Sequence, residues 1–162
     1  MNKKAIIFII LIVLAAATAI FIFSNSLQSG EMSMAESASV IEWLRPIIDP
    51  AGRLSTEKLQ FIVRKTAHFA EYFLLGLELS VITLTISKKI FTPWLFMPLF
   101  LILFTAVIDE LIQSFTGRTS LLSDVLLDFF GGVCALVFFI CIYALISAVK
   151  KKKNKPRITE TL

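Results

Sequence analysis

The chain of 162 residues contains a single histidine and only two cysteines, and this scarcity excludes several kinds of site. If Cys134 and Cys141 share a helix, about 10 Å of rise separates them, which is too far for a disulfide. They also lack the spacing of a metal-ligating pair, so a zinc site built from thiolates is excluded. We interpret both cysteines as small buried hydrophobic residues.

Charge is also scarce, because 17% of the residues are charged while 57% are hydrophobic and the mean hydropathy is +0.83. A soluble core cannot absorb so much apolar surface. A hydrocarbon layer about 30 Å thick requires roughly 20 apolar residues per spanning helix. Four segments qualify: Ala5–Phe23, Thr66–Ile86, Pro93–Phe115 and Leu121–Val149. The sequence therefore predicts an all-α membrane protein, a four-transmembrane-helix bundle forming one domain over residues 1–149, with a basic cytoplasmic tail over residues 150–162.

The first segment has features of a secretory signal peptide, because Lys3 and Lys4 precede it and small residues recur from Ala15 to Ala19. Its apolar run continues to Phe23, which is longer than a typical signal h-region. We therefore expect an uncleaved membrane anchor. Whether the segment is a cleaved signal peptide or an uncleaved anchor, the loop that follows it is directed to the outside.

Lysine and arginine are concentrated in segments that would share one side of the membrane, which identifies that side as cytoplasmic. These residues are Lys3, Lys4, Lys88, Lys89, Lys150–Lys153, Lys155 and Arg157. The loop from Ser24 to Lys65 and the short loop containing Arg118 should then face outside. We expect both termini in the cytoplasm. The basic tail directly follows a membrane helix, which favours contact with anionic lipid and argues against nucleic acid as a partner.

The first outer loop has a structure of its own. Ser33 and Glu36 match a capping box, and apolar residues recur at helical spacing until Pro46, which should end the helix. This pattern predicts a short amphipathic helix that lies in the headgroup layer or packs over the bundle. The sequence Asp49-Pro50-Ala51-Gly52 then predicts a turn, and from Thr56 one continuous helix can run into the second span.

Ionisable residues in the last three spans share one depth. In the helix that runs into the second span, Arg64, His68 and Glu71 lie on one helical stripe, which must face the bundle because an unpaired charge in lipid is costly. The third span contributes the acids Asp109 and Glu110 together with the amide Gln113, and the fourth contributes Asp124 and Asp128. Counted inward from the outer helix ends at 1.5 Å per residue, nearly all lie within roughly the first 10 Å. Three helices thus present their ionisable groups in one layer.

Four sequence strings resemble the VanZ-like membrane protein family in their order and spacing: FSNSLQSG (Phe23–Gly30), RKTAHFAEYFLLG (Arg64–Gly76), DELIQSFTGR (Asp109–Arg118) and SDVLLDFFGG (Ser123–Gly132). The resemblance implies a small multi-pass protein of the bacterial cell membrane, associated in the family's named member with resistance to the glycopeptide teicoplanin. The polar motif positions of the family correspond to His68, Glu71, Tyr72, Asp109, Glu110, Gln113, Arg118 and Asp124. Asp128 stands where many relatives are expected to have an amide.

The residues favour an enzyme that acts on a lipid headgroup or a lipid-linked cell-wall precursor at the outer leaflet. The predicted catalytic residues are His68, Glu71, Asp109, Glu110 and Asp124, with His68 as general acid or base. The predicted substrate-binding residues are Arg64, Lys65, Tyr72, Gln113, Arg118 and Asp128, in which the cations would hold a phosphate or carboxylate. A divalent cation held by Glu71, Asp109, Glu110 and Asp124 is a further hypothesis.

Three alternatives remain open. The same residues could form a non-catalytic site that binds or shields an antibiotic or a wall precursor. A small transporter is another alternative, because Glu78 lies deeper in the second span and could mark a proton path. The plainest alternative is structural: Arg64 could pair with Glu71, and Arg118 with Asp124, to fix helix ends at the membrane interface.

Overall fold

The computed structural model describes residues 2–87, 93–118 and 121–153, and all regular structure in these ranges is helical. The elements are α1 (Lys3–Ser26), α2 (Gly30–Ile48), α3 (Thr56–Ser87), the 3-10 turn η1 (Pro93–Leu95), α4 (Phe96–Phe115) and α5 (Leu122–Lys153). Helices α1, α3, α4 and α5 are each long and apolar enough to cross a membrane. The prediction of an all-α membrane protein with four spans is therefore confirmed.

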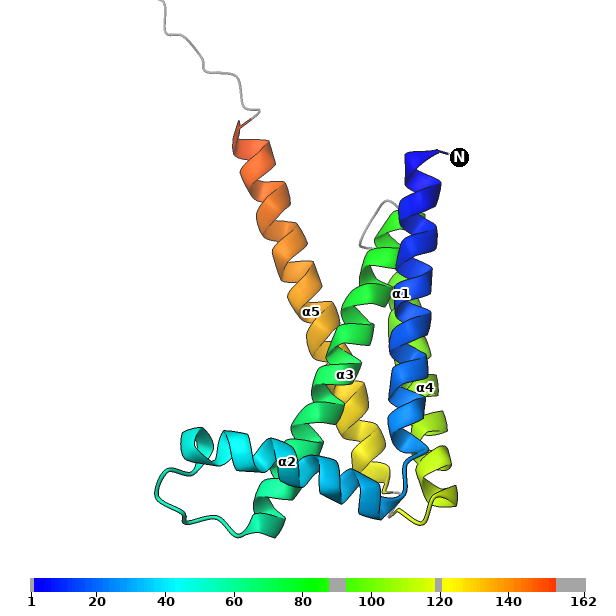
Figure 1. Ribbon diagram of the computed structural model, residues 1–162. Coiled ribbons are helices and arrows are strands. Elements are labelled where there is room, and N and C mark those ends of the chain that lie inside the picture. The colour runs from blue at the N-terminus through cyan, green and yellow to red at the C-terminus, as the bar shows by residue number, and fades with distance from the viewer. Residues whose placement is uncertain (1, 88–92, 119–120, 154–162) are drawn as a thin grey trace, which may run out of the picture.

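The four long helices alternate in direction, and α2 lies across one end of the bundle (Figure 1). The start of α1 and the end of α5 lie at the opposite end, where α5 leans away from the other helices (Figure 1). Lys3, Lys4 and Lys150–Lys153 therefore share the end away from α2. Lys88, Lys89, Lys155 and Arg157 lie outside the described residues.

Small residues bring α5 into close contact with α3 and α4. A Cβ atom built on Gly131 would lie 2.7 Å from the carbonyl oxygen of Phe69, and one built on Gly132 would lie 2.5 Å from the side chain of Ile102. Such distances leave no room for a side chain, so the α5 backbone packs directly against its neighbours. Ala135 continues this surface and is fully buried. The close approach occurs next to the ionisable residues and fixes their relative positions.

Helix α2 is longer than predicted at both ends. It begins at Gly30, and the Ser29 hydroxyl caps it by accepting a hydrogen bond from Met32 N at 3.4 Å. The predicted capping box at Ser33 is therefore wrong, because Ser33 lies inside the helix. Pro46 also lies inside the helix, which ends at Ile48. A proline lacks only its own N–H, so the two residues after it can still donate to earlier carbonyls.

The predicted turn after α2 is present and is held by one carboxylate. Asp49 accepts hydrogen bonds from Arg53 N at 2.8 Å and Leu54 N at 2.9 Å. These two N–H groups, with that of Leu54 the stronger, lower the pKa of Asp49 below its usual value. Helix α3 then begins at Thr56 and continues without interruption through the second span, as predicted.

Both cysteines are free, but their burial differs from the prediction. Cys134 is half-buried and Cys141 is exposed. The prediction that both are buried is wrong for Cys141, because the second half of α5 separates from the other helices (Figure 1). This part of α5 presents its side chains to the surroundings of the bundle.

Candidate functional site

Polar side chains from four helices and one loop meet at the α2 end of the bundle. The layer contains Asn25 and Ser26 of α1; Arg64, Lys65, His68, Glu71 and Tyr72 of α3; Asp109, Glu110 and Gln113 of α4; Arg118 of the α4–α5 loop; and Asp124 and Asp128 of α5. The structure thus brings together every residue proposed above for catalysis or substrate binding. Their functional roles remain predictions.

At the centre of this layer lie His68, Asp109 and Asp128, which we call the His68 cluster. His68 Nδ1 is 3.8 Å from Asp109 Oδ2 and 3.8 Å from Asp128 Oδ1. The two carboxylates have exposed fractions of 0% and 1%, whereas the histidine side chain is 18% exposed. Two acids that are shielded from solvent therefore face one partly accessible imidazole.

Gln113 holds one member of the cluster in position. Its side-chain amide donates hydrogen bonds to Asp109 Oδ2 at 3.0 Å and to Ser26 Oγ at 3.2 Å, and all three residues are buried. The bond to Asp109 follows from the i,i+4 spacing on α4. The Tyr72 side chain is also fully buried beside the cluster, and its hydroxyl has no hydrogen-bond partner among the described residues.

Three other carboxylates of the layer each have a partner of their own. Asp124 forms an ion pair with Lys65, Glu71 accepts a hydrogen bond from Asn25 at 2.8 Å, and Glu110 accepts one from Leu121 N at 3.1 Å. The four carboxylates proposed from sequence to hold a divalent cation therefore do not meet at one point. Of these four, only Asp109 belongs to the His68 cluster. The second acid of the cluster is Asp128, which was not among the four.

The ion pairs suggested by the structural alternative are not formed in the described parts of the chain. Arg64 does not pair with Glu71, nor Arg118 with Asp124, because these two acids bind Asn25 and Lys65 instead. The two arginines are left without a carboxylate partner there. Ion pairing at the helix ends therefore accounts for Lys65 but not for Arg64 or Arg118.

Two small cavities open beside the His68 cluster, of about 150 Å³ and about 100 Å³. Arg64 and His68 line both. The larger cavity is completed mainly by Asn25, Glu71 and Arg118 and by side chains of α2. The smaller one is completed by Phe61, Lys65, Gln113, Leu121 and Asp124. His68 can thus be reached by a molecule of a few atoms from either side of α3.

The larger cavity brings two guanidinium groups, of Arg64 and Arg118, together with the carboxylates of Glu36 and Glu71. Arg118 donates a hydrogen bond to the carbonyl oxygen of Asn25 at 3.3 Å, which holds the α4–α5 loop over the end of α1. The pKa of Arg118 is lowered first by burial and then by the neighbouring charge of Arg64. A guanidinium nevertheless stays charged in a protein at neutral pH. The Nε atoms of both arginines lack a hydrogen-bond partner among the described residues. Two such guanidinium groups at one cavity favour an anionic ligand.

Residues of α2 that line this cavity were not predicted as part of the site. Ser33, Glu36 and Ser37 face it, and Gln28 donates to Glu36 at 3.1 Å. The signal was available, because Ser33, Glu36, Ser37 and Val40 recur at intervals of three and four. From sequence, Ser33 and Glu36 match a capping box and the helix either lies in the headgroup layer or packs over the bundle, whereas in the structure this stripe lines the cavity at the end of the bundle.

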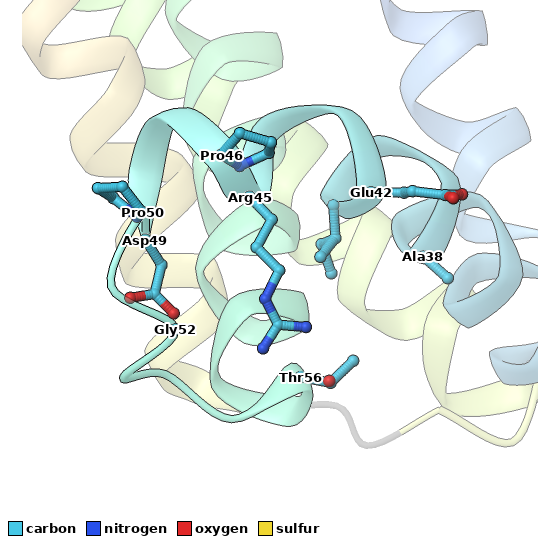
Figure 2. Close-up of a pocket in the computed structure, with 9 residues that line it drawn as sticks. Ala38, Glu42, Arg45, Pro46, Asp49, Pro50, Gly52 and Thr56 are labelled. Carbon is cyan, nitrogen blue, oxygen red and sulfur yellow. The ribbon is translucent and has the colours of Figure 1, made fainter.

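A wider cavity, of about 430 Å³, lies between α2 and the start of α3 (Figure 2). Arg45 extends into it and donates to the carbonyl oxygen of Leu54 at 3.3 Å, while Asp49 binds the N–H groups of the turn. Two of its three charged side chains, those of Arg45 and Asp49, therefore hold the loop that closes it. It lacks the facing acids and histidine of the cluster, so it is a weaker candidate for a chemical site.

Glu78, the deeper acid of α3, accepts a hydrogen bond from the Thr18 hydroxyl of α1 at 3.1 Å. This contact ties two membrane helices together, which is the usual role of a polar side chain at that position. Glu78 is therefore separate from the layer at the α2 end. The contact favours the structural account of this residue over a proton path.

Replacing Gln113 with leucine should destabilise the α2 end of the bundle. The change removes one of two side-chain hydrogen bonds to the buried Asp109 carboxylate and also the bond from Gln113 to Ser26 Oγ, at an expected cost of about 2–4 kcal/mol. Unfolding of the purified protein in mixed detergent micelles measures the effect. Gln60→Leu is the matched control, because no side-chain hydrogen bond is recorded for Gln60; an equal loss in both variants would contradict the role of Gln113.

The fold and the site define a small multi-pass α-helical membrane protein with a charged site at one end of its bundle. A family model described as VanZ/LLP1 matches residues 7–145. The chain therefore belongs to the VanZ/LLP1 family, as its sequence motifs indicated. Neither the comparison with curated proteins nor the comparison with solved structures found a match.

Proposed function

We propose that this protein binds the phosphate group of a lipid headgroup or lipid-linked envelope precursor and hydrolyses its phosphate ester. The observation that carries the proposal is the cavity of about 150 Å³ lined by Arg64, Arg118 and His68, beside two buried carboxylates. A phosphate group would complete the hydrogen bonding of the two guanidinium groups. The cavity lies at the end of a membrane bundle, where headgroups are found.

The reaction is written as addition of water to the phosphate ester. The water oxygen forms a bond to phosphorus, the bond between phosphorus and the lipid oxygen breaks, and the products are inorganic phosphate and a lipid alcohol. One proton leaves the attacking water and one reaches the departing oxygen. The His68 cluster is placed to accept and return them, while the arginines neutralise the charge on the phosphoryl oxygens.

We place this activity at the outer leaflet of a bacterial membrane. The lysine residues at the start of α1 and the end of α5 lie at the end of the bundle away from α2, and such residues are enriched on the cytoplasmic side. Processing of a lipid-linked wall precursor there would connect the protein to glycopeptide or envelope-stress resistance. Deleting the gene should therefore increase susceptibility to teicoplanin.

The biochemical test is release of inorganic phosphate from a polyprenyl phosphate or a phosphatidate in mixed micelles. Arg118→Ala should raise KM about tenfold or more, since a charge-assisted hydrogen bond contributes about 1.5–3 kcal/mol. Arg53→Ala is the control, because Arg53 is exposed and outside the cavity. Saturable binding without phosphate release would favour the non-catalytic alternative. No binding of either lipid would refute the proposal.

A further inference from the structure

We propose that His68, Asp109 and Asp128 form a site for one divalent cation of the Mn²⁺ or Zn²⁺ type. The site shares His68 with the arginine cavity that carries the proposed function, and its other two ligands, Asp109 and Asp128, lie outside the lining of that cavity. It does not rest on that function, because cation binding is measured without any lipid.

The spacing of the three side chains fits a shared cation. One ligand atom from each residue can be chosen such that all three lie within 4.8 Å of one another, and His68 Nδ1 is 3.8 Å from an oxygen of each acid. At 3.8 Å, nitrogen and oxygen are too far apart for a hydrogen bond. Ligand atoms that each lie 2.0–2.2 Å from one metal are separated by about 3–4 Å. The two distances from His68 Nδ1 therefore match coordination better than direct contact.

Asp128 supplies an independent reason to expect a ligand. Its side chain is 1% exposed, and neither carboxylate oxygen has a hydrogen-bond donor within the ranges that the structure describes. The His68 Nδ1 atom and Asp109 Oδ1 also lack a partner there. Buried polar atoms in native proteins nearly always have partners, and an ion explains several such atoms around one point.

The chemistry of the three ligands indicates the kind of cation. Two carboxylates and a neutral imidazole carry two negative charges, which a divalent ion balances. Carboxylates favour Mn²⁺ and Mg²⁺, and imidazole favours first-row metals such as Zn²⁺ and Fe²⁺, so a mixed set favours Mn²⁺ or Zn²⁺. Three protein ligands leave positions for water or substrate, as in catalytic metal sites.

The surroundings of the cluster suit a metal site. Gln113 donates to Asp109 Oδ2 at 3.0 Å and so orients one ligand, which is the usual role of a residue behind a metal ligand. The two cavities lined by His68 give a cation access from outside. A cation bound there would add positive charge beside Arg64, and a water on it would provide a nucleophile.

The test is direct binding of Mn²⁺ to the full-length protein in detergent after treatment with a chelator, followed by electron paramagnetic resonance. We expect one Mn²⁺ per chain, displaced by Zn²⁺. Asp128→Asn keeps the side-chain shape and should weaken Mn²⁺ binding at least tenfold. Asp124→Asn is the matched control. It removes a carboxylate of the same layer that pairs with Lys65 and not with His68, so it should change Mn²⁺ binding less than twofold.

Failure to fold is checked by helicity and size-exclusion behaviour. A second measurement needs no carboxylate variant: the bound Mn²⁺ should show magnetic coupling to one imidazole nitrogen, and His68→Gln should remove it. The proposal is overturned if the wild-type protein binds neither Mn²⁺ nor Zn²⁺ saturably. It is also overturned if the nitrogen coupling is absent, or if Asp124→Asn weakens binding as much as Asp128→Asn.

Discussion

Replacing Gly131 with leucine is expected to prevent α3 and α5 from packing, with loss of the folded bundle. Even a Cβ atom at this position would lie 2.7 Å from the carbonyl oxygen of Phe69, and a backbone carbonyl cannot rotate away as a side chain does. The two helices would have to separate. Because Asp128 lies one helical turn before Gly131 and His68 is adjacent to Phe69, the separation would also open the His68 cluster.

The alanine variant gives the sharper measurement. Replacing a glycine with alanine inside a helix normally stabilises it by about 0.5–1 kcal/mol. Gly131→Ala should instead destabilise the protein by about 1–3 kcal/mol, the usual range for overpacking. The shift in the midpoint of thermal unfolding in detergent shows whether Gly131→Ala stabilises or destabilises the protein. Cys141→Leu serves as the control, because it adds volume at an exposed position of the same helix; an unchanged or raised midpoint in Gly131→Ala would contradict the close contact.

The helices were largely predictable because their physical cause is local. A run of apolar residues long enough to cross a bilayer specifies a helix in almost any surroundings. The ends were less predictable, since hydropathy reports depth in the membrane and not where hydrogen bonding stops. The first span therefore extends to Ser26, three residues past the apolar run, and α2 begins at Gly30 because Ser29 caps it.

The layer of ionisable residues could be predicted from depth alone, but its internal pairing could not. Asp124 and Asp128 share a face of α5, yet one turn of helix separates them along the axis. That offset places Asp124 beside Lys65 and Asp128 beside His68. Which acids meet depends on how three helices are rotated against one another, and the contact at Gly131 decides that rotation. No spacing within a single helix contains this information.

The covering position of α2 was also beyond the sequence pattern. An amphipathic helix at a membrane surface can turn its polar stripe either to water or to a polar partner in the protein. In both orientations the polar side chains find hydrogen-bond partners, so the residue pattern does not distinguish them. The structure shows Ser33, Glu36 and Ser37 turned towards Arg64 and Arg118 around one cavity. A helix that covers a charged cavity can restrict which headgroups enter, which links α2 to substrate selection under the proposed function.

His68→Ala is expected to reduce phosphate release by about 10²–10⁴-fold, the range associated with loss of general acid–base catalysis. His68 is the only imidazole of the chain, and it is the member of the cluster that both cavities reach. Initial rates at saturating lipid measure the effect. Glu78→Gln is the matched control on the same helix, because a glutamine can still accept the hydrogen bond from Thr18 and should leave the rate within about twofold. A rate that falls in Glu78→Gln and not in His68→Ala would contradict the catalytic role of His68.

The cause of the His68→Ala defect can be separated into two roles by adding back what the variant lacks. If His68 transfers protons, free imidazole should restore part of the rate and added Mn²⁺ should not. If His68 is a cation ligand, millimolar Mn²⁺ should restore part of the rate, because Asp109 and Asp128 remain to bind it weakly. Arg118→Ala should respond to neither addition, since its defect lies in holding the phosphate. The two roles exclude each other at Nδ1, because a nitrogen that coordinates a metal has no lone pair left to accept a proton.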